Sequence, residues 1–173
     1  MWAGVLGLVV IIATGFALKD WIREEWYLYR LTQGDEKAQR AAAERLGEMR
    51  SVRAVPLLAD RLVVRSDEHV GDRVPVGVSP MGVEHATVVE SWDYCQHIQK
   101  ALVNIGAPGV PVLLERMKRD ATARLEIMPV LGEMGAEARG AVPALREWVN
   151  DPDCGLMAKL ALSRIESTDA LPR

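Results

Sequence analysis

The sequence has few cysteines, few aromatic residues and little net charge, and each shortage excludes a class of protein. Two cysteines, Cys95 and Cys154, are too few and too far apart to hold a small domain together by disulfides. A formal net charge of −3 gives no overall positive field, so we expect no nucleic-acid partner. The hydrophobic content of 49% over 173 residues excludes a fully disordered chain and suits one domain of ordinary size.

The few aromatic residues are unevenly placed. Beyond residue 30 only Trp92, Tyr94 and Trp148 are aromatic, and all the others lie before it. This contrast predicts two segments in different surroundings, a membrane anchor over 1–30 and a folded repeat domain over 31–173.

The apolar run at the start predicts one transmembrane helix. Residues 2–18 contain a single polar side chain, Thr14. As a helix this run spans roughly 25 Å, near the lower limit for crossing a hydrocarbon core of about 30 Å. Trp2 lies at one end, and Trp21 and Trp26 follow the other, where interfacial aromatic residues belong. We therefore expect the lipid bilayer to surround the run and a juxtamembrane helix to follow it.

Charge beside the run decides its expected orientation. Lys19, Arg23 and Arg30 follow the run, and no basic side chain precedes it. The positive-inside rule then places the N-terminus outside and the rest of the chain in the cytoplasm. A cleaved signal peptide with its cleavage site at 15–17 is one alternative, but it lacks the basic residues expected before the run. A buried soluble helix is the other alternative.

Small or slim side chains recur along the run at spacings of four and three residues, which places them on one face of a helix. Small residues allow another transmembrane helix to approach closely, and close packing drives association in lipid. We predict that this stripe contacts an integral-membrane protein subunit. The alternative is that glycine and alanine are simply common in membrane helices. The stripe consists of Ala3, Gly7, Val10, Thr14 and Ala17.

The remainder of the chain contains an internal repeat. Leu-Gly-Glu-Met occurs at 46–49 and again at 131–134. A Val-Pro pair with apolar neighbours follows each copy and also occurs at Pro111. Pro111 and Pro143 are 32 residues apart, whereas Pro56 and Pro111 are 55 apart. Three units therefore share one period if the second carries an insertion.

Each unit has the pattern of a helical hairpin. Apolar residues recur with helical spacing on both sides of a turn, and the proline falls in the first turn of the second helix, where its missing N–H costs little. We therefore expect an all-α fold, a short α-solenoid of about three hairpins with a terminal capping helix. The expected repeats are 35–65, 90–119 and 120–150, the cap is 153–166 and the insertion is 66–89.

These units resemble HEAT-type repeats, especially the short bacterial form of the phycobilisome-lyase-like family. The matching elements are Leu-Gly near the end of the first helix and Ala-Val-Pro-x-Leu opening the second. The resemblance covers roughly 35–165 and implies stacked hairpins that bury small aliphatic side chains. Members of this group include scaffolds and adaptors, and a minority act on bilin chromophores. Nothing in the sequence marks a bilin site, so we expect no cofactor and no catalytic residue.

The insertion at 66–89 predicts a β-hairpin. Valines at 74, 76 and 78 alternate with proline and glycine, and Ser79-Pro80-Met81-Gly82 has the composition of a turn. Loops inserted between repeat helices often lie on the binding face. We predict that Val76, Val78 and Met81 contact a protein partner, and a mobile loop is the alternative.

The histidines lie in or just after the insertion. His85, Cys95 and His97 are the residues that would compose a metal site, but Cys95 and His97 fall on different sides of a helix and their spacing fits no standard ligand pair. We expect a surface cluster and no bound metal.

Charged residues recur at equivalent positions after the repeat prolines, so they should line one surface of stacked hairpins. We call this set the charged ladder. It is either a solvated face with inter-repeat ion pairs or a docking surface for another protein. The charged ladder consists of Asp60, Arg61, Glu115, Arg116, Glu147 and the adjacent Trp148.

These features together predict a non-catalytic accessory subunit, anchored in a bacterial inner membrane, that stabilises a larger integral-membrane complex. The anchor would contact membrane subunits, while the solenoid and the insertion would contact a protein surface. A freestanding tethered adaptor that recruits a soluble protein is the first alternative, and an enzyme of the bilin-lyase kind is the second.

Overall fold

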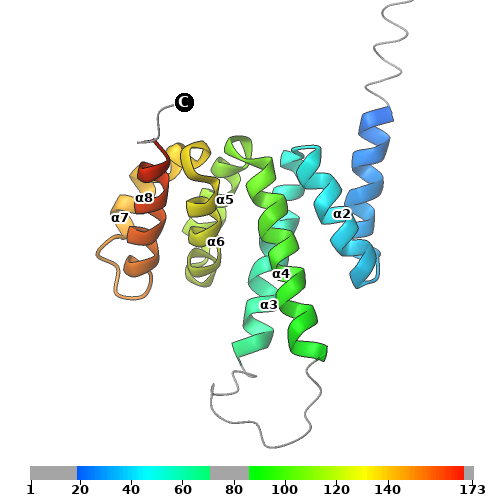
Figure 1. Cartoon of the computed structure of the whole chain (residues 1–173), viewed down its shortest axis with the longest axis horizontal. Coiled ribbons are helices and arrows are strands. Elements are labelled where there is room, and N and C mark those ends of the chain that lie inside the picture. Colours follow the sequence, from blue (N-terminus) through cyan, green and yellow to red (C-terminus); the bar gives the residue numbers. More distant parts are fainter. Residues whose placement is uncertain (1–18, 71–85, 170–173) are drawn as a thin grey trace, which may run out of the picture.

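The computed structural model describes residues 19–70 and 86–169, which form helices joined by short turns (Figure 1). The α-helices are a segment at 19–33, α2 (Glu36–Glu48), α3 (Val55–Val70), α4 (Ala86–Ile105), α5 (Val110–Arg119), α6 (Ala121–Met134), α7 (Val142–Trp148) and α8 (Gly155–Asp169). Short 3-10 helices η1 (Val52–Ala54), η2 (Ala107–Gly109) and η3 (Gly135–Ala141) lie in the turns inside the hairpins.

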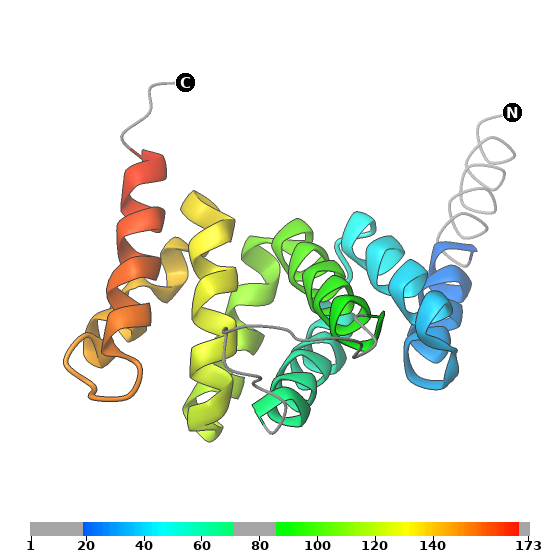
Figure 2. The same ribbon diagram turned by 60° about the horizontal axis from the view of Figure 1, so that its bottom comes forward.

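The helices form two layers. Helices α2, α4, α6 and α8 lie side by side in one layer, and α3, α5 and α7 form the other (Figures 1 and 2). The helix at 19–33 stands at one end of the array and α8 at the other. The expected solenoid-like stack of helical hairpins is therefore confirmed.

The β-hairpin predicted for 66–89 is wrong. The structure continues α3 to Val70 and begins α4 at Ala86, so both ends of the predicted insertion are helical. No strand occurs within 19–70 or 86–169. A short apolar run such as the valines at 88 and 89 does not distinguish a strand from a helix, and here it lies in α4. Val76, Val78 and Met81 lie outside the described residues.

The fold class with a transmembrane helix also needs correction. None of the described helices is long and apolar enough to cross a membrane. The expected span at 2–18, with its stripe of Ala3, Gly7, Val10, Thr14 and Ala17, lies outside the described residues.

The repeated leucines form the core of the array. Leu46, Leu102 and Leu131 occupy equivalent places near the ends of first-layer helices, and all three are fully buried. Leu58 and Leu113 follow the repeat prolines and are also fully buried. Because burying one leucine contributes about 1.5–3 kcal/mol, these positions explain why the motif recurs.

The glycine of the Leu-Gly motif allows neighbouring hairpins to approach closely. A Cβ atom on Gly47 of α2 would lie 2.8 Å from the Cα of Ala101 in α4. A Cβ atom on Gly132 of α6 would lie 3.3 Å from the Cα of Ala161 in α8. Both glycines therefore serve packing within the first layer.

One carboxylate links the turns of successive repeats. Glu137 of the third repeat accepts a hydrogen bond from the backbone N–H of Ala107 at 3.1 Å and pairs with the Arg50 guanidinium at 3.1 Å. The Nε of Arg50 also donates to the carbonyl of Asn104 at 3.1 Å. These contacts join the turns of all three repeats along one edge.

The helix at 19–33 belongs to the array. Leu28 and Leu31 are buried in the same core as the repeat leucines. The hydroxyl of Ser51, in the first repeat's turn, donates a hydrogen bond to Glu24. Arg61 of α3 donates to the carbonyl of Thr32 at 3.2 Å. The helix thus crosses the boundary drawn at residue 30 and covers the first repeat.

Replacing Gly47 by alanine tests the close approach. Alanine normally stabilises a helix interior by about 1 kcal/mol relative to glycine. Here the added methyl must push α2 from α4, so we expect Gly47→Ala to lower the free energy of unfolding by about 1–3 kcal/mol. Urea unfolding followed by circular dichroism measures it.

Gly140→Ala is the matched control, because its Cβ would meet only Val110 Cγ1 at 3.8 Å. We expect this variant to match or exceed the native stability. A Gly47→Ala variant as stable as Gly140→Ala would show that the two helices do not approach as described.

Candidate functional site

The charged ladder lies on the second-layer helices α3, α5 and α7, and one of its pairs joins neighbouring repeats. The Arg116 guanidinium contacts the Asp60 carboxylate at 3.0 Å and the Asp120 carboxylate at 3.3 Å. Arg116 therefore links α3 to α5 and to the start of α6. Its side chain is only 30% exposed, so most of its surface is covered by the array.

The other ladder residues also make contacts inside the chain. Arg61 donates to the Gln39 side chain at 3.0 Å, in addition to Thr32. Glu115 pairs with Lys118 at 3.3 Å within α5. The Arg124 guanidinium lies 5.0 Å from the centroid of the Trp148 ring, a cation–π contact between α6 and α7.

Glu147 is exposed on α7. One ladder pair, Asp60–Arg116, thus joins two repeats, whereas the other contacts lie within one repeat or reach the helix at 19–33. The ladder's role as a docking surface stays a prediction.

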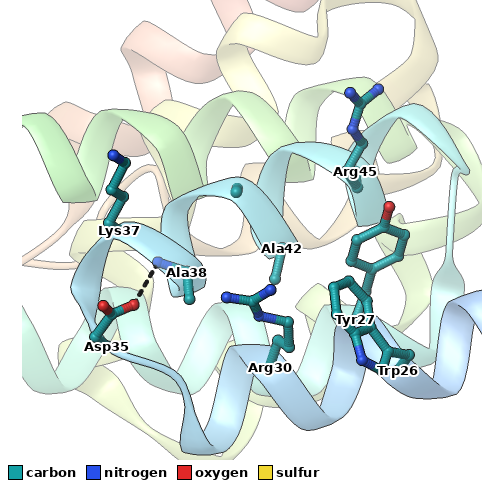
Figure 3. Close-up of a pocket in the computed structure, with 9 residues that line it drawn as sticks. Trp26, Tyr27, Arg30, Asp35, Lys37, Ala38, Ala42 and Arg45 are labelled. Atoms are coloured by element: carbon teal, nitrogen blue, oxygen red, sulfur yellow. Dashed lines mark hydrogen bonds between the residues drawn. The ribbon is translucent and has the colours of Figure 1, made fainter.

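A groove that the sequence analysis missed lies between the helix at 19–33 and α2 (Figure 3). Its floor is made of alanine side chains from α2, and aromatic and basic side chains form its walls. The groove has a volume of about 370 Å³. It is lined by Trp26, Tyr27, Arg30, Asp35, Lys37, Ala38, Ala41, Ala42 and Arg45.

The groove has a positive character. The Arg30 guanidinium lies 4.8 Å from the centroid of the Trp26 ring, and Trp26 packs edge-on against Tyr27 at 5.0 Å. The one lining carboxylate, Asp35, accepts a hydrogen bond from the backbone N–H of Ala38 at 2.9 Å and caps α2. Among the described residues, no carboxylate pairs with Arg30 or Lys37.

Arg45 is the exception among the cations of the groove. It pairs with Glu48 at 2.7 Å, and the hydrogen bond to Glu48 raises the pKa of Arg45. This cation is partly neutralised, so Arg30 and Lys37 provide most of the positive charge.

The histidine and cysteine positions form no metal site in the described part of the chain. No group of three or more metal-ligating side chains gathers there, and His85 lies outside the described residues. Cys154 is buried, and that burial raises the pKa of its thiol. A thiol with a raised pKa is mostly protonated at neutral pH, which makes it a poor nucleophile.

Residues 38–63 match the family described as PBS lyase HEAT-like repeat. They form a HEAT-like repeat. The matched stretch comprises most of α2, the turn and the first part of α3, and it includes Leu46-Gly47 and Pro56. No curated protein and no solved structure matches the chain significantly.

A double-mutant cycle on Asp60→Asn and Arg116→Gln tests the inter-repeat ion pair. Both side chains are partly exposed, at 57% and 30%, so solvent screens their attraction. We expect a coupling of about 0.2–1 kcal/mol in the free energy of unfolding, decreasing as salt is raised. The pair Glu115–Lys118 within α5 is the control and should contribute no more than Asp60–Arg116. Zero coupling at low salt would contradict the contact.

Thiol reactivity tests the burial of Cys154. We expect Cys95→Ser, which keeps only Cys154, to react with an aromatic disulfide far more slowly when folded than when unfolded. Because the pKa of Cys154 is raised, the thiolate fraction at pH 7 is smaller than for an ordinary thiol, and the folded rate should increase toward higher pH. Cys154→Ser is the control, because Cys95 is half-buried. Equal rates in folded and unfolded Cys95→Ser would refute the burial.

Proposed function

We propose that this chain is a non-catalytic accessory subunit that binds another protein through the outward face of α8. The inward face of α8 packs on α6 and α7 through Ala158, Ala161 and Ile165, all buried. On the opposite face, Leu156 is 70% exposed and Leu160 is 50% exposed. These two leucines are one helical turn apart and therefore form a single apolar patch.

This exposed patch carries the proposal. A helix inside a stacked array has two apolar faces, one for each neighbour, whereas a terminal helix needs a polar outer face. The expected cap over 153–166 has the inner face of a terminal helix, but its outer face is apolar over the first turns. Ser163 and Ser167 continue the same face, so the patch ends in polar residues.

A helix of the partner protein, with its own apolar stripe, would occupy the next place in the stack. Met157, which is 37% exposed, borders the patch and suits it because methionine adapts to irregular surfaces. The proposal depends on α8 alone and requires no membrane span. A permanent subunit would recover its partner in fixed stoichiometry, whereas a transient adaptor would recover substoichiometric clients.

The double variant Leu156→Ser and Leu160→Ser tests this face. We expect it to reduce recovery of the partner at least tenfold, because apolar anchors at the centre of an interface each contribute about 2 kcal/mol or more. The measurement is affinity purification of the tagged full chain in mild detergent, with the co-purifying chains quantified against the bait.

Leu125→Ser is the matched control, since Leu125 is an exposed leucine of α6 at 39% and lies outside the patch. Light scattering of the purified chain gives the second readout. A dimer that the double variant converts to a monomer would show that the face binds a second copy, which would contradict a different partner. Equal recovery with both variants would also contradict the proposal.

A further inference from the structure

We propose that the helix at 19–33 lies flat on an anionic lipid surface and that the array contacts the bilayer through this end. The inference concerns the end of the array opposite α8 (Figure 2). It is independent of protein binding at α8, so either proposal can fail alone.

An apolar stripe runs along the outward side of this helix. Ile22, Trp26 and Tyr29 follow at spacings of four and three residues, and they are 53%, 50% and 65% exposed. Leu28 and Leu31 on the opposite side are buried in the array. The helix therefore has two apolar sides. One packs on the protein core and the other faces outward.

Basic residues flank the stripe on the side toward α2. Lys19 and Arg30 come from the helix itself and Lys37 comes from across the groove, whereas the nearby Arg23 and Arg45 are paired with Asp20 and Glu48. Helices that lie in a bilayer interface combine large apolar and aromatic side chains with lysine and arginine at the edge. Tryptophan and tyrosine also favour the headgroup level.

The acidic residues of the helix do not oppose this arrangement. Glu24 accepts a hydrogen bond from Ser51 and pairs with Arg53 at 3.4 Å, on the protein side. Glu25 pairs with Arg53 at 2.9 Å, and Asp20 pairs with Arg23 at 3.7 Å. These carboxylates are engaged with cations, while Arg30 remains for an external anion.

The groove suits a phosphate group of a lipid. Arg30, stacked on Trp26, forms one wall, and Lys37 stands on the other side of the alanine floor (Figure 3). A phosphodiester that enters from the outside would meet Arg30, with Lys37 at the α2 edge of the same groove, while the acyl chains lie against Ile22 and Trp26. The cations of the groove and the apolar stripe beside it thus both favour an anionic lipid as the ligand.

The sequence before this helix favours a bilayer over a protein as the occupant. The described structure begins at residue 19, and residues 2–18 contain one polar side chain, Thr14. The chain therefore enters the helix from an apolar stretch, and the exposed stripe starts within the next turn. The sequence predicted that residues 19–30 would lead away from the membrane. Their packing against the array instead places their free side along the lipid surface.

Quenching of tryptophan fluorescence by lipids with brominated acyl chains tests the contact. The full chain would keep only Trp26, with Trp2, Trp21, Trp92 and Trp148 replaced by phenylalanine. The matched control keeps only Trp148, at the far end of the array. In vesicles of phosphatidylcholine and phosphatidylglycerol, we expect at least threefold stronger quenching for Trp26 than for Trp148. Equal quenching of the two would overturn the proposal.

Vesicles of phosphatidylcholine alone test the anionic component. We expect quenching of Trp26 to fall at least twofold in them, and Arg30→Gln with Lys37→Gln should cause the same loss in the mixed vesicles. Circular dichroism would establish that the variant remains folded. Quenching that is independent of both phosphatidylglycerol and the two cations would refute headgroup binding in the groove.

Discussion

Close backbone approach between neighbouring hairpins is the constraint on which the rest of the structure depends. Gly47 meets Ala101 and Gly132 meets Ala161 without space for a larger side chain between the backbones. At such distances α2 must follow the direction of α4, and α6 that of α8, because a small tilt would produce a backbone clash. The second layer then lies where the hairpin turns place it. Small residues thus set the spacing of these helices, while aliphatic side chains fill the core, which contains no aromatic residue in the described part of the chain.

The same constraint separates residues that hold the array together from residues that are free to bind. Asp60 is the fourth residue after one repeat proline and Arg116 the fifth after the next, so stacking of the two repeats brings them within ion-pair distance. Glu137 likewise joins turns that stacking has already brought together. Stacking therefore engages Asp60 with Arg116 and Arg50 with Glu137 in contacts between repeats. The two ends have no neighbour within the described chain, and large exposed apolar side chains concentrate there: Trp21, Ile22, Trp26 and Tyr29 at one end, and Leu156, Met157 and Leu160 at the other.

The repeated features of the fold could be predicted from the sequence, whereas features that occur only once, such as the groove, were missed. Equivalent leucines and prolines gave the hairpins and their core, because burial imposes the same residue at the same place in each repeat. The predicted β-hairpin failed at both ends of the insertion, which belong to α3 and α4, because a short apolar run does not by itself distinguish a strand from a helix. The groove was missed because Trp26 and Arg30 had been assigned to a membrane segment. Their composition does not distinguish a helix surrounded by lipid from one that packs against the array through Leu28 and Leu31.

The stacked helices separate the two apolar ends of the array. Neighbouring helices contact one another in both layers, and Glu137 joins the turns of the repeats along one edge. Ligands bound as proposed at the helix 19–33 and at α8 would therefore be held apart by the length of the array. Binding at one end would restrict the positions that the other end can reach. No change of fold would be needed for one ligand to affect the other. A spacer of this kind would work through geometry, which would require no catalytic group.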